Sequence, residues 1–569
     1  MTRAEFVLPA AALLFTACSR EPRNPADLVL QGGLVYTVDS LRPRAEAIAV
    51  ADGRIVYVGT NDSAQAFIGR ATQVIDVKGR MVLPGFHDTH VHPVSGGLEL
   101  GDCDLNPALT EADVRRIVAA CAAREPKGAW VRGGGWALPI FPNGASRYLL
   151  DSLVPDRPAL LSSADGHSGW ANSQALAIGG VTRATRDPVN GRIERDAAGE
   201  PTGTLRESAQ RLVDRQMPRR SSAEYLAGLE RGLAMAARLG ITTLHEASAS
   251  EPIALAYAEA DSLGRLTARV VVNLRVDLAA PVEEEVARLS ALRARTARGL
   301  VRPAAAKIFM DGVIEAQTAA LLAPYLDRPG YRGDVNVAPA KFNEFVRQLD
   351  SAGFKVHVHA IGDRAIRVAF DGFGQQFARD KGAGPRHIIA HIQLFDPADI
   401  PRFAALGVVA SFQPLWAYAD SYITDLTEPK LGPARSRYLY PIASVVRTGA
   451  IVAAGSDWSV SSMNPLEAIQ VAVTRRGLDD STGKAWIPEE LVDLATMLRA
   501  YTLGGAIASE HDSLTGTLSV GKAADLIVVS EDLFALPAHR IGKARVLLTL
   551  VGGRETYRDR AMSERETPP

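Results

Sequence analysis

A repeating unit of amphipathic helix, glycine and apolar strand runs through the middle of this chain. Residues 223–239 have helical periodicity and are followed by Gly240 and the strand-like run 241–246, and the same order recurs over residues 341–359. Glycine commonly ends a helix because it readily adopts the left-handed backbone conformation needed there. Strands that alternate with helices predict a parallel sheet with helical crossovers.

Eight apolar runs of the chain end in polar side chains. Eight parallel strands close a (β/α)8 barrel, and such barrels keep their active sites at the carboxyl ends of the strands. We therefore expect an α/β fold with a TIM-like (β/α)8 barrel. The expected strand ends are His90 and His92, residues 162–165, 245–246 and 307–310, His359, His391, and residues 411–413 and 453–457.

Short strand-like runs separated by glycine turns occur near both ends of the chain. Residues 27–59 contain several, with a turn at Asp52-Gly53, and similar runs return over residues 516–553. Such spacing is typical of hairpins in a small sheet. We predict one β-sandwich domain formed by residues 25–82 and 512–557, with the barrel, residues 83–511, inserted between its two parts.

The composition is that of an ordinary globular protein. Of the 569 residues, 47% are hydrophobic and 22% are charged, and the formal net charge is -1. Such a chain can bury a large core. A nearly neutral charge gives no electrostatic basis for binding nucleic acid, so we expect a small molecule as the partner.

The first residues have the features of an export signal. Residues 6–17 form an apolar stretch that is too short to span a bilayer as a mature helix but suits the apolar part of a signal peptide. Residues 14–18 resemble a bacterial lipobox, which leaves a cysteine as the new N-terminus for lipid attachment. We expect residues 1–18 to be a signal peptide and the protein to be exported from a bacterium, either periplasmic or anchored as a lipoprotein at Cys18. An N-terminal tail with a chance cysteine is the alternative.

The other two cysteines, Cys103 and Cys121, are too few for a disulfide framework. An exported location would permit one bridge between them. The sequence leaves open whether they pair.

Histidines at a spacing of two on a strand point to the same face, so His90 and His92 can converge on one metal ion. Each unpaired polar group in a buried strand costs about 2 to 7 kcal/mol, and a divalent cation would compensate several such groups at once. Imidazole and carboxylate are ordinary zinc ligands. The candidate ligands are His90, His92, Lys307, His359, His391 and Asp457.

Structural alternatives remain for these candidates. Two histidines in a polar loop would look like His90 and His92, and Lys307 could be a buried lysine paired with Asp311 or another carboxylate. His357 and His359 point to the same strand face and compete for one ligand position, which leaves the other as a core or supporting histidine.

Six motifs occur in order over about residues 27–551. They are 83–92, 307–312 with 318–319 and 324–325, 359–365, 390–393, 455–457 and 521–526. Together they resemble the amidohydrolase superfamily, and more narrowly its YtcJ-like branch (amidohydrolase family 3), which includes N-substituted formamide deformylases.

The resemblance implies a role for each candidate ligand. His90 and His92 would hold one metal, Lys307 would be carboxylated on its amine and bridge two, and Asp457 would be both ligand and proton carrier. His359, favoured over His357, and His391 would complete the site. We expect one or two divalent ions per chain, with zinc first, although iron and manganese also suit these ligand types. The family commonly forms dimers, so a homodimer is also implied.

The resemblance implies a metal-dependent hydrolase acting on carbon–nitrogen bonds other than peptide bonds. We expect metal-activated water to cleave a small amide-like substrate, such as an N-substituted formamide or an N-acyl amine, with Asp457 as proton shuttle. One alternative is attack on an ester, carbamate or cyclic amide, or a deamination. The other is a metal-binding protein without catalysis.

Two segments supply candidate substrate-binding residues. Residues 165–173 combine His167, Trp170 and small residues after a strand, and resemble a substrate-contact segment of the same family. Residues 413–418 offer Gln413 and Trp416 to an apolar or aromatic substrate. A surface turn and a stripe of core residues, respectively, are the alternatives.

Overall fold

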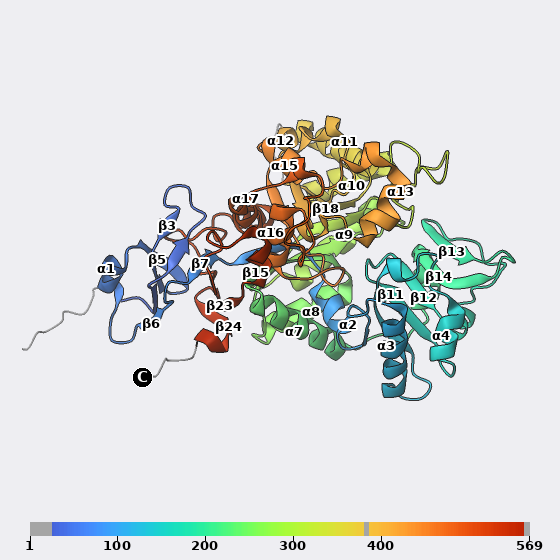
Figure 1. Cartoon of the computed structure of the whole chain (residues 1–569), viewed down its shortest axis with the longest axis horizontal. Coiled ribbons are helices and arrows are strands. Elements are labelled where there is room, and N and C mark those ends of the chain that lie inside the picture. Colours follow the sequence, from blue (N-terminus) through green and yellow to red (C-terminus); the bar gives the residue numbers. More distant parts are fainter. Residues whose placement is uncertain (1–24, 380–385, 563–569) are drawn as a thin grey trace, which may run out of the picture.

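The structure is a computed structural model that describes residues 25–379 and 386–562 (Figure 1). The predicted signal peptide, residues 1–18 with Cys18, lies outside the described residues. Within them, no helix combines the length and the apolar character needed to cross a membrane.

Eight parallel strands form one sheet that curls into a barrel. The first and last strands meet where the Thr89 hydroxyl donates a hydrogen bond of 2.9 Å to the carbonyl oxygen of Ala454. The predicted (β/α)8 fold class is thereby confirmed. In sheet order the strands are β8 (Phe86–Val91), β15 (Ile241–Ala249), β16 (Arg269–Arg275), β17 (Val301–Phe309), β18 (Lys355–Ala360), β19 (Ile388–His391), β20 (Val409–Phe412) and β21 (Val452–Ala454).

Helices follow the strands as the periodicity predicts. A capping box formed by Ser221 and Glu224 starts α7, and the left-handed Gly240 (φ 79°) turns the chain into β15. Gly353 (φ 73°) does the same before β18. The helices of this part are α2 (Pro93–Glu99), α7 (Ser222–Arg238), α8 (Glu251–Ser262), α9 (Val282–Thr296), α10 (Pro339–Ser351), α11 (Asp363–Arg379), α12 (Arg402–Leu406), α13 (Glu428–Leu431), α14 (Pro433–Ser436), α15 (Ile442–Arg447), α16 (Pro465–Thr474), α17 (Leu494–Arg499) and α18 (Gly505–Ser509).

One expected barrel strand is wrong. The run that ends at residues 162–165 is β11, which belongs to a different sheet, and β16 is the barrel strand in its place. Both runs are short and apolar, and only long-range pairing separates them: β16 lies between β15 and β17, whereas β11 pairs with β10 and β12.

The second sheet forms a lobe inserted between β8 and α7 (Figure 1, cyan and teal). Trp136 and Trp170 lie in its own hydrophobic core, and a disulfide between Cys103 and Cys121 joins β9 to α3. The predicted barrel range 83–511 contains this lobe without separating it. The lobe consists of β9 (Cys103–Asp104), β10 (Val131–Trp136), β11 (Ala159–Ser163), β12 (Ser168–Ala171), β13 (Gly191–Arg195), β14 (Pro201–Glu207), α3 (Glu111–Arg124), α4 (Arg147–Leu153), α5 (Ser173–Ile178) and α6 (Arg211–Asp214).

Both ends of the described chain build a pair of mixed sheets beside the barrel. Strand β22 near the C-terminus pairs antiparallel with β7 near the N-terminus, and one core joins Val50 to Leu548. The predicted turn at Asp52-Gly53 has positive φ at both residues (49° and 71°), as a tight hairpin turn needs. One of these two sheets contains β1 (Leu28–Gln31), β4 (Ala47–Ala51), β5 (Arg54–Gly59) and β6 (Gln73–Asp76), and helix α1 (Asn61–Ala64) lies in the same part of the chain. The other sheet contains β2 (Leu34–Tyr36), β3 (Arg44–Ala45), β7 (Met81–Pro84), β22 (Leu526–Val529), β23 (Val546–Val551) and β24 (Arg554–Arg558).

Candidate metal centre

The six candidate ligands all lie at the carboxyl ends of barrel strands. Pro93 starts α2 directly after β8, so His92 stands at the turn between strand and helix. Asp457 follows β21, and its backbone N–H donates to the carbonyl oxygen of His90 at 2.7 Å. The remaining candidates are Lys307 on β17, His359 on β18 and His391 at the end of β19.

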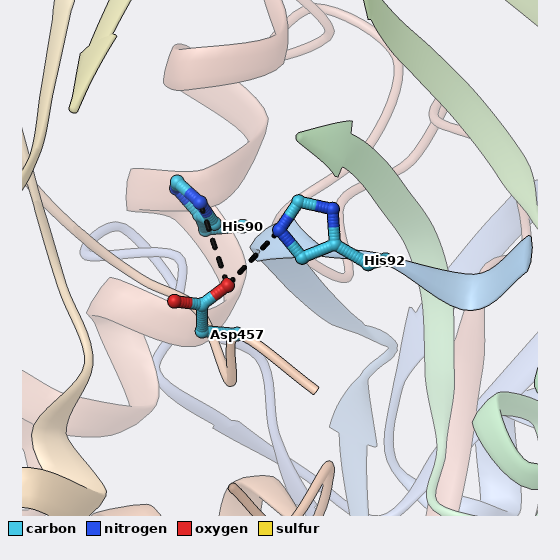
Figure 2. A group of neighbouring side chains, drawn as sticks. All are labelled: His90, His92 and Asp457. Atoms are coloured by element: carbon cyan, nitrogen blue, oxygen red, sulfur yellow. Dashed lines mark ion pairs between the residues drawn. The ribbon is translucent and has the colours of Figure 1, made fainter. Parts of the chain in front are cut away.

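His90, His92 and Asp457 form the centre of the group (Figure 2). One ligand atom of each lies within 4.8 Å of the others. Asp457 Oδ1 is 3.1 Å from His92 Nε2 and 3.6 Å from His90 Nε2. Two imidazoles and a carboxylate oxygen are thus directed at one point, as metal coordination requires.

The other three candidates adjoin this centre. Lys307 Nζ is 3.2 Å from His90 Nε2, and His391 Nδ1 is 3.7 Å from Asp457 Oδ2. The His391 ring lies 4.5 Å, between centroids, from the rings of both His90 and His359. The structure therefore brings all six candidates into one continuous cluster.

Unpaired buried atoms indicate that the cluster suits a cation. His391 Nδ1 and Asp457 Oδ1 are buried without a hydrogen bond of good geometry, and the polar groups that face Oδ1 are the ring nitrogens of His92 and His90, at 3.1 and 3.6 Å. Both residues also have left-handed backbones, with φ of 77° and 55°. Unpaired polar atoms and such conformations each cost about 1 to 3 kcal/mol and persist where function requires them. A divalent cation would pair these atoms, so the donor set fits a metal ion.

Burial sets the charge of the imidazoles. It lowers the pKa of His90, His359 and His391 well below the usual range, so these rings are neutral and offer a lone pair. His92 differs because Asp457 and Glu246 outweigh the effect of burial and raise its pKa to about 9. A metal that binds there competes with a proton.

Lys307 is a fully buried amine. Burial lowers its pKa to about 7, so a neutral amine is accessible. The alternative pairing with Asp311 is not formed: that carboxylate accepts backbone N–H groups from Ala320, Ile361 and Gly362 at 2.9, 3.0 and 2.9 Å. The amine instead faces His90.

Three residues near the ligands received no ligand role from the sequence. Glu246 Oε1 lies 3.4 Å from His92 Nδ1, and Asp88 Oδ1 accepts the backbone N–H groups of His90 and Ser456. His357 Nε2 is 3.0 Å from His90 Nδ1, which makes His357 a supporting histidine. The signal for Asp88 and Glu246 was a carboxylate inside an apolar strand.

Two of the four candidate substrate residues lie beside the cluster. His167 comes from the lobe; its Nδ1 is 2.9 Å from Glu207 Oε2, and its ring centroid is 5.4 Å from that of His359. Trp416 stacks on His391 with centroids 5.7 Å apart and planes 5° apart.

Gln413 and Trp170 are both fully buried but differ in pairing. Gln413 directly follows β20, and both of its amide atoms lack a partner. Trp170 packs against Trp136 and Phe141 in the lobe, and its indole N–H already donates to the carbonyl oxygen of Ser146. Trp170 therefore offers a ligand neither exposed surface nor a free donor, and the structure assigns it to the core of the lobe.

Fold and donor set together define a class: barrel proteins whose mouth can hold a metal ion. A sequence profile described as "Amidohydrolase family" matches residues 73–557. This chain belongs to the amidohydrolase family. Hydrolysis of small molecules is therefore its class of reaction.

Curated relatives match over nearly the whole chain. Protein LONG AFTER FAR-RED 3 of Arabidopsis thaliana is 32% identical over 94% of this chain and 92% of its own length. Putative amidohydrolase YtcJ of Bacillus subtilis is 29% identical (93% and 99%), and N-substituted formamide deformylase of Arthrobacter pascens is 27% identical (93% and 97%). The predicted YtcJ-like branch is confirmed.

A solved structure described as an uncharacterized metal-dependent hydrolase from Pyrococcus horikoshii OT3 has the same fold. It aligns with a TM-score of 0.71 at 22% identity over 90% of this chain and 99% of that one. This likeness supports the barrel and the accompanying β-sheets.

Proposed function

We propose that this protein hydrolyses the carbon–nitrogen bond of a small amide-like substrate, of the N-substituted formamide or N-acyl amine type, with a divalent metal, zinc first. The observation that carries the proposal is the convergence of His90, His92 and Asp457 within 4.8 Å at the barrel mouth. The formamide class is supported by the deformylase that is 27% identical over 93% of this chain.

The bound metal would supply Lewis acidity, lowering the pKa of water and polarising a carbonyl oxygen. Neutral His90, His359 and His391 would hold it through their lone pairs. The carboxylate of Asp457, whose two oxygens face different histidines, accepts the proton of the attacking water and passes it to the leaving nitrogen.

Lys307 is proposed to be carboxylated and so to hold two ions. Its neutral amine would add to carbon dioxide and lose a proton, leaving a carbamate whose oxygens would supply metal ligands. Burial and the lowered pKa support this step. About two metals per chain would be found by elemental analysis. One metal per chain, with an unmodified lysine mass, would argue against the bridge.

His167 and Trp416 are proposed to bind the substrate. Glu207 outweighs the effect of burial and raises the pKa of His167 to about 9, so its ring is an imidazolium that can donate to a substrate oxygen. Trp416 offers an aromatic face beside the metal ligands. Gln413 contributes an amide without a partner at the same strand edge.

The test is hydrolysis by purified, metal-loaded protein of N-formyl amines, N-acyl amino acids, aryl esters and hydantoins. We expect turnover of the N-formyl or N-acyl amines, and its loss in Asp457→Asn even when that variant is assayed with excess metal. Turnover of esters or hydantoins alone would reassign the bond that is cleaved. Tight metal binding without any turnover would support a binding protein instead.

Export is also proposed. The Cys103–Cys121 disulfide supports it, because such bonds persist in oxidising compartments. Fractionation of the source cells tests it: recovery of the full-length chain with residues 1–18 attached from the cytoplasm would contradict it.

A further inference from the structure

The two ring nitrogens of His90 have different surroundings. Nε2 faces the candidate metal centre, 3.2 Å from Lys307 Nζ and 3.6 Å from Asp457 Oδ1. Nδ1 points away from it and lies 3.0 Å from His357 Nε2. Nε2 would therefore be the atom that binds a metal, and His357 would fix the ring through a hydrogen bond with Nδ1.

His357 is in turn held by Asn273. Its Nδ1 lies 3.0 Å from the side-chain amide nitrogen, Nδ2, of Asn273. His90, His357 and Asn273 come from three different strands, β8, β18 and β16, and expose 1%, 0% and 0% of their surface. Since solvent does not reach them, each must satisfy its neighbour directly.

The number of protons on each neutral imidazole determines which ring nitrogens of His90 and His357 are donors. A neutral imidazole has one N–H, so a metal on His90 Nε2 leaves the proton on Nδ1, which donates to His357 Nε2. His357 must then carry its own proton on Nδ1. That N–H needs an acceptor, and of the two amide atoms of Asn273 only Oδ1 accepts.

The arrangement in the structure has the amide the other way round. Nδ2 faces His357, while Oδ1 is buried without a hydrogen-bond partner. With Nδ2 as donor, His357 protonates at Nε2 and donates to His90 Nδ1, and the proton of His90 sits on Nε2, the atom that should bind metal. The unpaired Oδ1 marks the strain of this order.

We propose that Asn273 and His357 are positioning residues, which, with the amide rotated by half a turn, hold His90 as the tautomer whose Nε2 is free for a metal. This inference rests on the proposed metal site but not on the substrate. In the rotated state Oδ1 accepts from His357, and Nδ2 turns toward the position that Oδ1 left.

His245, on the neighbouring strand β15, has a buried ring nitrogen without a hydrogen-bond partner. The Ser509 hydroxyl donates to the carbonyl oxygen of Gly505 at 2.7 Å, so at 2.7 Å from His245 Nε2 it accepts. The proton of His245 is therefore on Nε2, and its Nδ1 is a buried lone pair that has no partner.

The test measures zinc affinity by competition with a chromogenic chelator for the wild type, Asn273→Leu and Asn273→Asp. Leucine, which has the same branching and number of heavy atoms, removes the acceptor and should weaken zinc binding by about 10- to 100-fold. Aspartate only accepts, so it should keep the affinity within about threefold of the wild type. The matched control is Thr243→Val on β15, which removes another buried, unpaired polar atom and should leave the affinity unchanged.

Equal losses of affinity in N273L and N273D, or no loss in N273L, would overturn the proposal. A readout that needs no variant is neutron diffraction from zinc-loaded crystals of the wild type. It should show deuterium on Nδ1 of both His90 and His357, with the amide oxygen of Asn273 toward His357. Deuterium on His357 Nε2 would also overturn it. Both measurements stand apart from hydrolysis, so failure of the proposed reaction would leave them valid.

Discussion

Two groups of histidines occupy the same barrel, and they differ in what joins them. In the mouth cluster, formed by His90, His92, His391 and Asp457, a carboxylate lies between the rings. In the deep cluster, His87 and His245 are joined through the hydroxyl of Ser509, at 3.5 and 2.7 Å. Among the described residues, the metal-ligating triplet that meets within 4.8 Å belongs to the mouth cluster.

The difference shows that a histidine inside an apolar strand is not by itself a metal ligand. Burial lowers the pKa of His90 and His391 in the mouth cluster and of His87 and His245 in the deep cluster, that of His87 to about 3, so these rings are neutral. A hydroxyl can satisfy a neutral ring with an ordinary hydrogen bond. In the mouth cluster the carboxylate of Asp457, which follows a separate strand, adds a negative charge that favours a bound cation.

Replacing one histidine of each cluster by asparagine, in separate variants, gives the strongest test of this contrast. His90→Asn should weaken zinc binding by more than about 100-fold, because losses of supporting residues alone reach 10- to 100-fold. His87→Asn should leave the affinity near that of the wild type. Chelator competition on both proteins, with circular dichroism as a check of folding, measures the effect. Comparable losses in the two variants would remove the distinction between the clusters.

The pH dependence of metal binding gives the next largest effect. Because the pKa of His92 is raised to about 9, a metal must displace its proton at lower pH. Zinc affinity should therefore rise about tenfold per pH unit up to about 9 and then level off. Glu246→Gln removes one carboxylate that raises this pKa, so levelling should begin at lower pH. A zinc affinity that stays constant from pH 7 to 9 would contradict competition between zinc and a proton for His92.

The smallest expected effect is on the KM, through His167, the histidine that the lobe contributes to the barrel mouth. Glu207→Gln weakens the hold on His167, and we expect KM to rise about five- to tenfold, as for loss of a hydrogen bond of about 1 to 1.5 kcal/mol. Zinc content should not change. Glu194→Gln, which alters an ion pair with Arg206 elsewhere in the lobe, is the matched control. A change in zinc content with constant KM would place Glu207 among the supports of the metal.

The sequence predicted those parts of the fold that local pattern determines. Polar residues that end apolar strands located seven of the eight barrel strands and the six candidate ligands that the structure brings into one cluster, because the carboxyl ends of parallel strands meet at one edge. The hairpin at Asp52-Gly53 followed from turn chemistry.

Long-range pairing decided what the sequence could not. The apolar runs of β11 and β16 are alike in length and character, and only their neighbouring strands differ. The sequence offered Trp170 as a substrate contact or as part of a surface turn, whereas the structure packs its ring against Trp136. His357 and His359 share a strand face, and only the partner on β8 shows that His357 supports His90.

The lobe that carries His167 is a continuous stretch of chain between β8 and α7, with a hydrophobic core and a disulfide of its own. The candidate metal ligands and the proposed substrate contact of His167 are thereby encoded in separate stretches of the gene. Chimaeras in which this stretch is replaced by that of a relative should keep their metal, while the part of substrate preference that depends on the lobe follows the donor. The fold thus lets selection vary this contact without disturbing the candidate metal ligands.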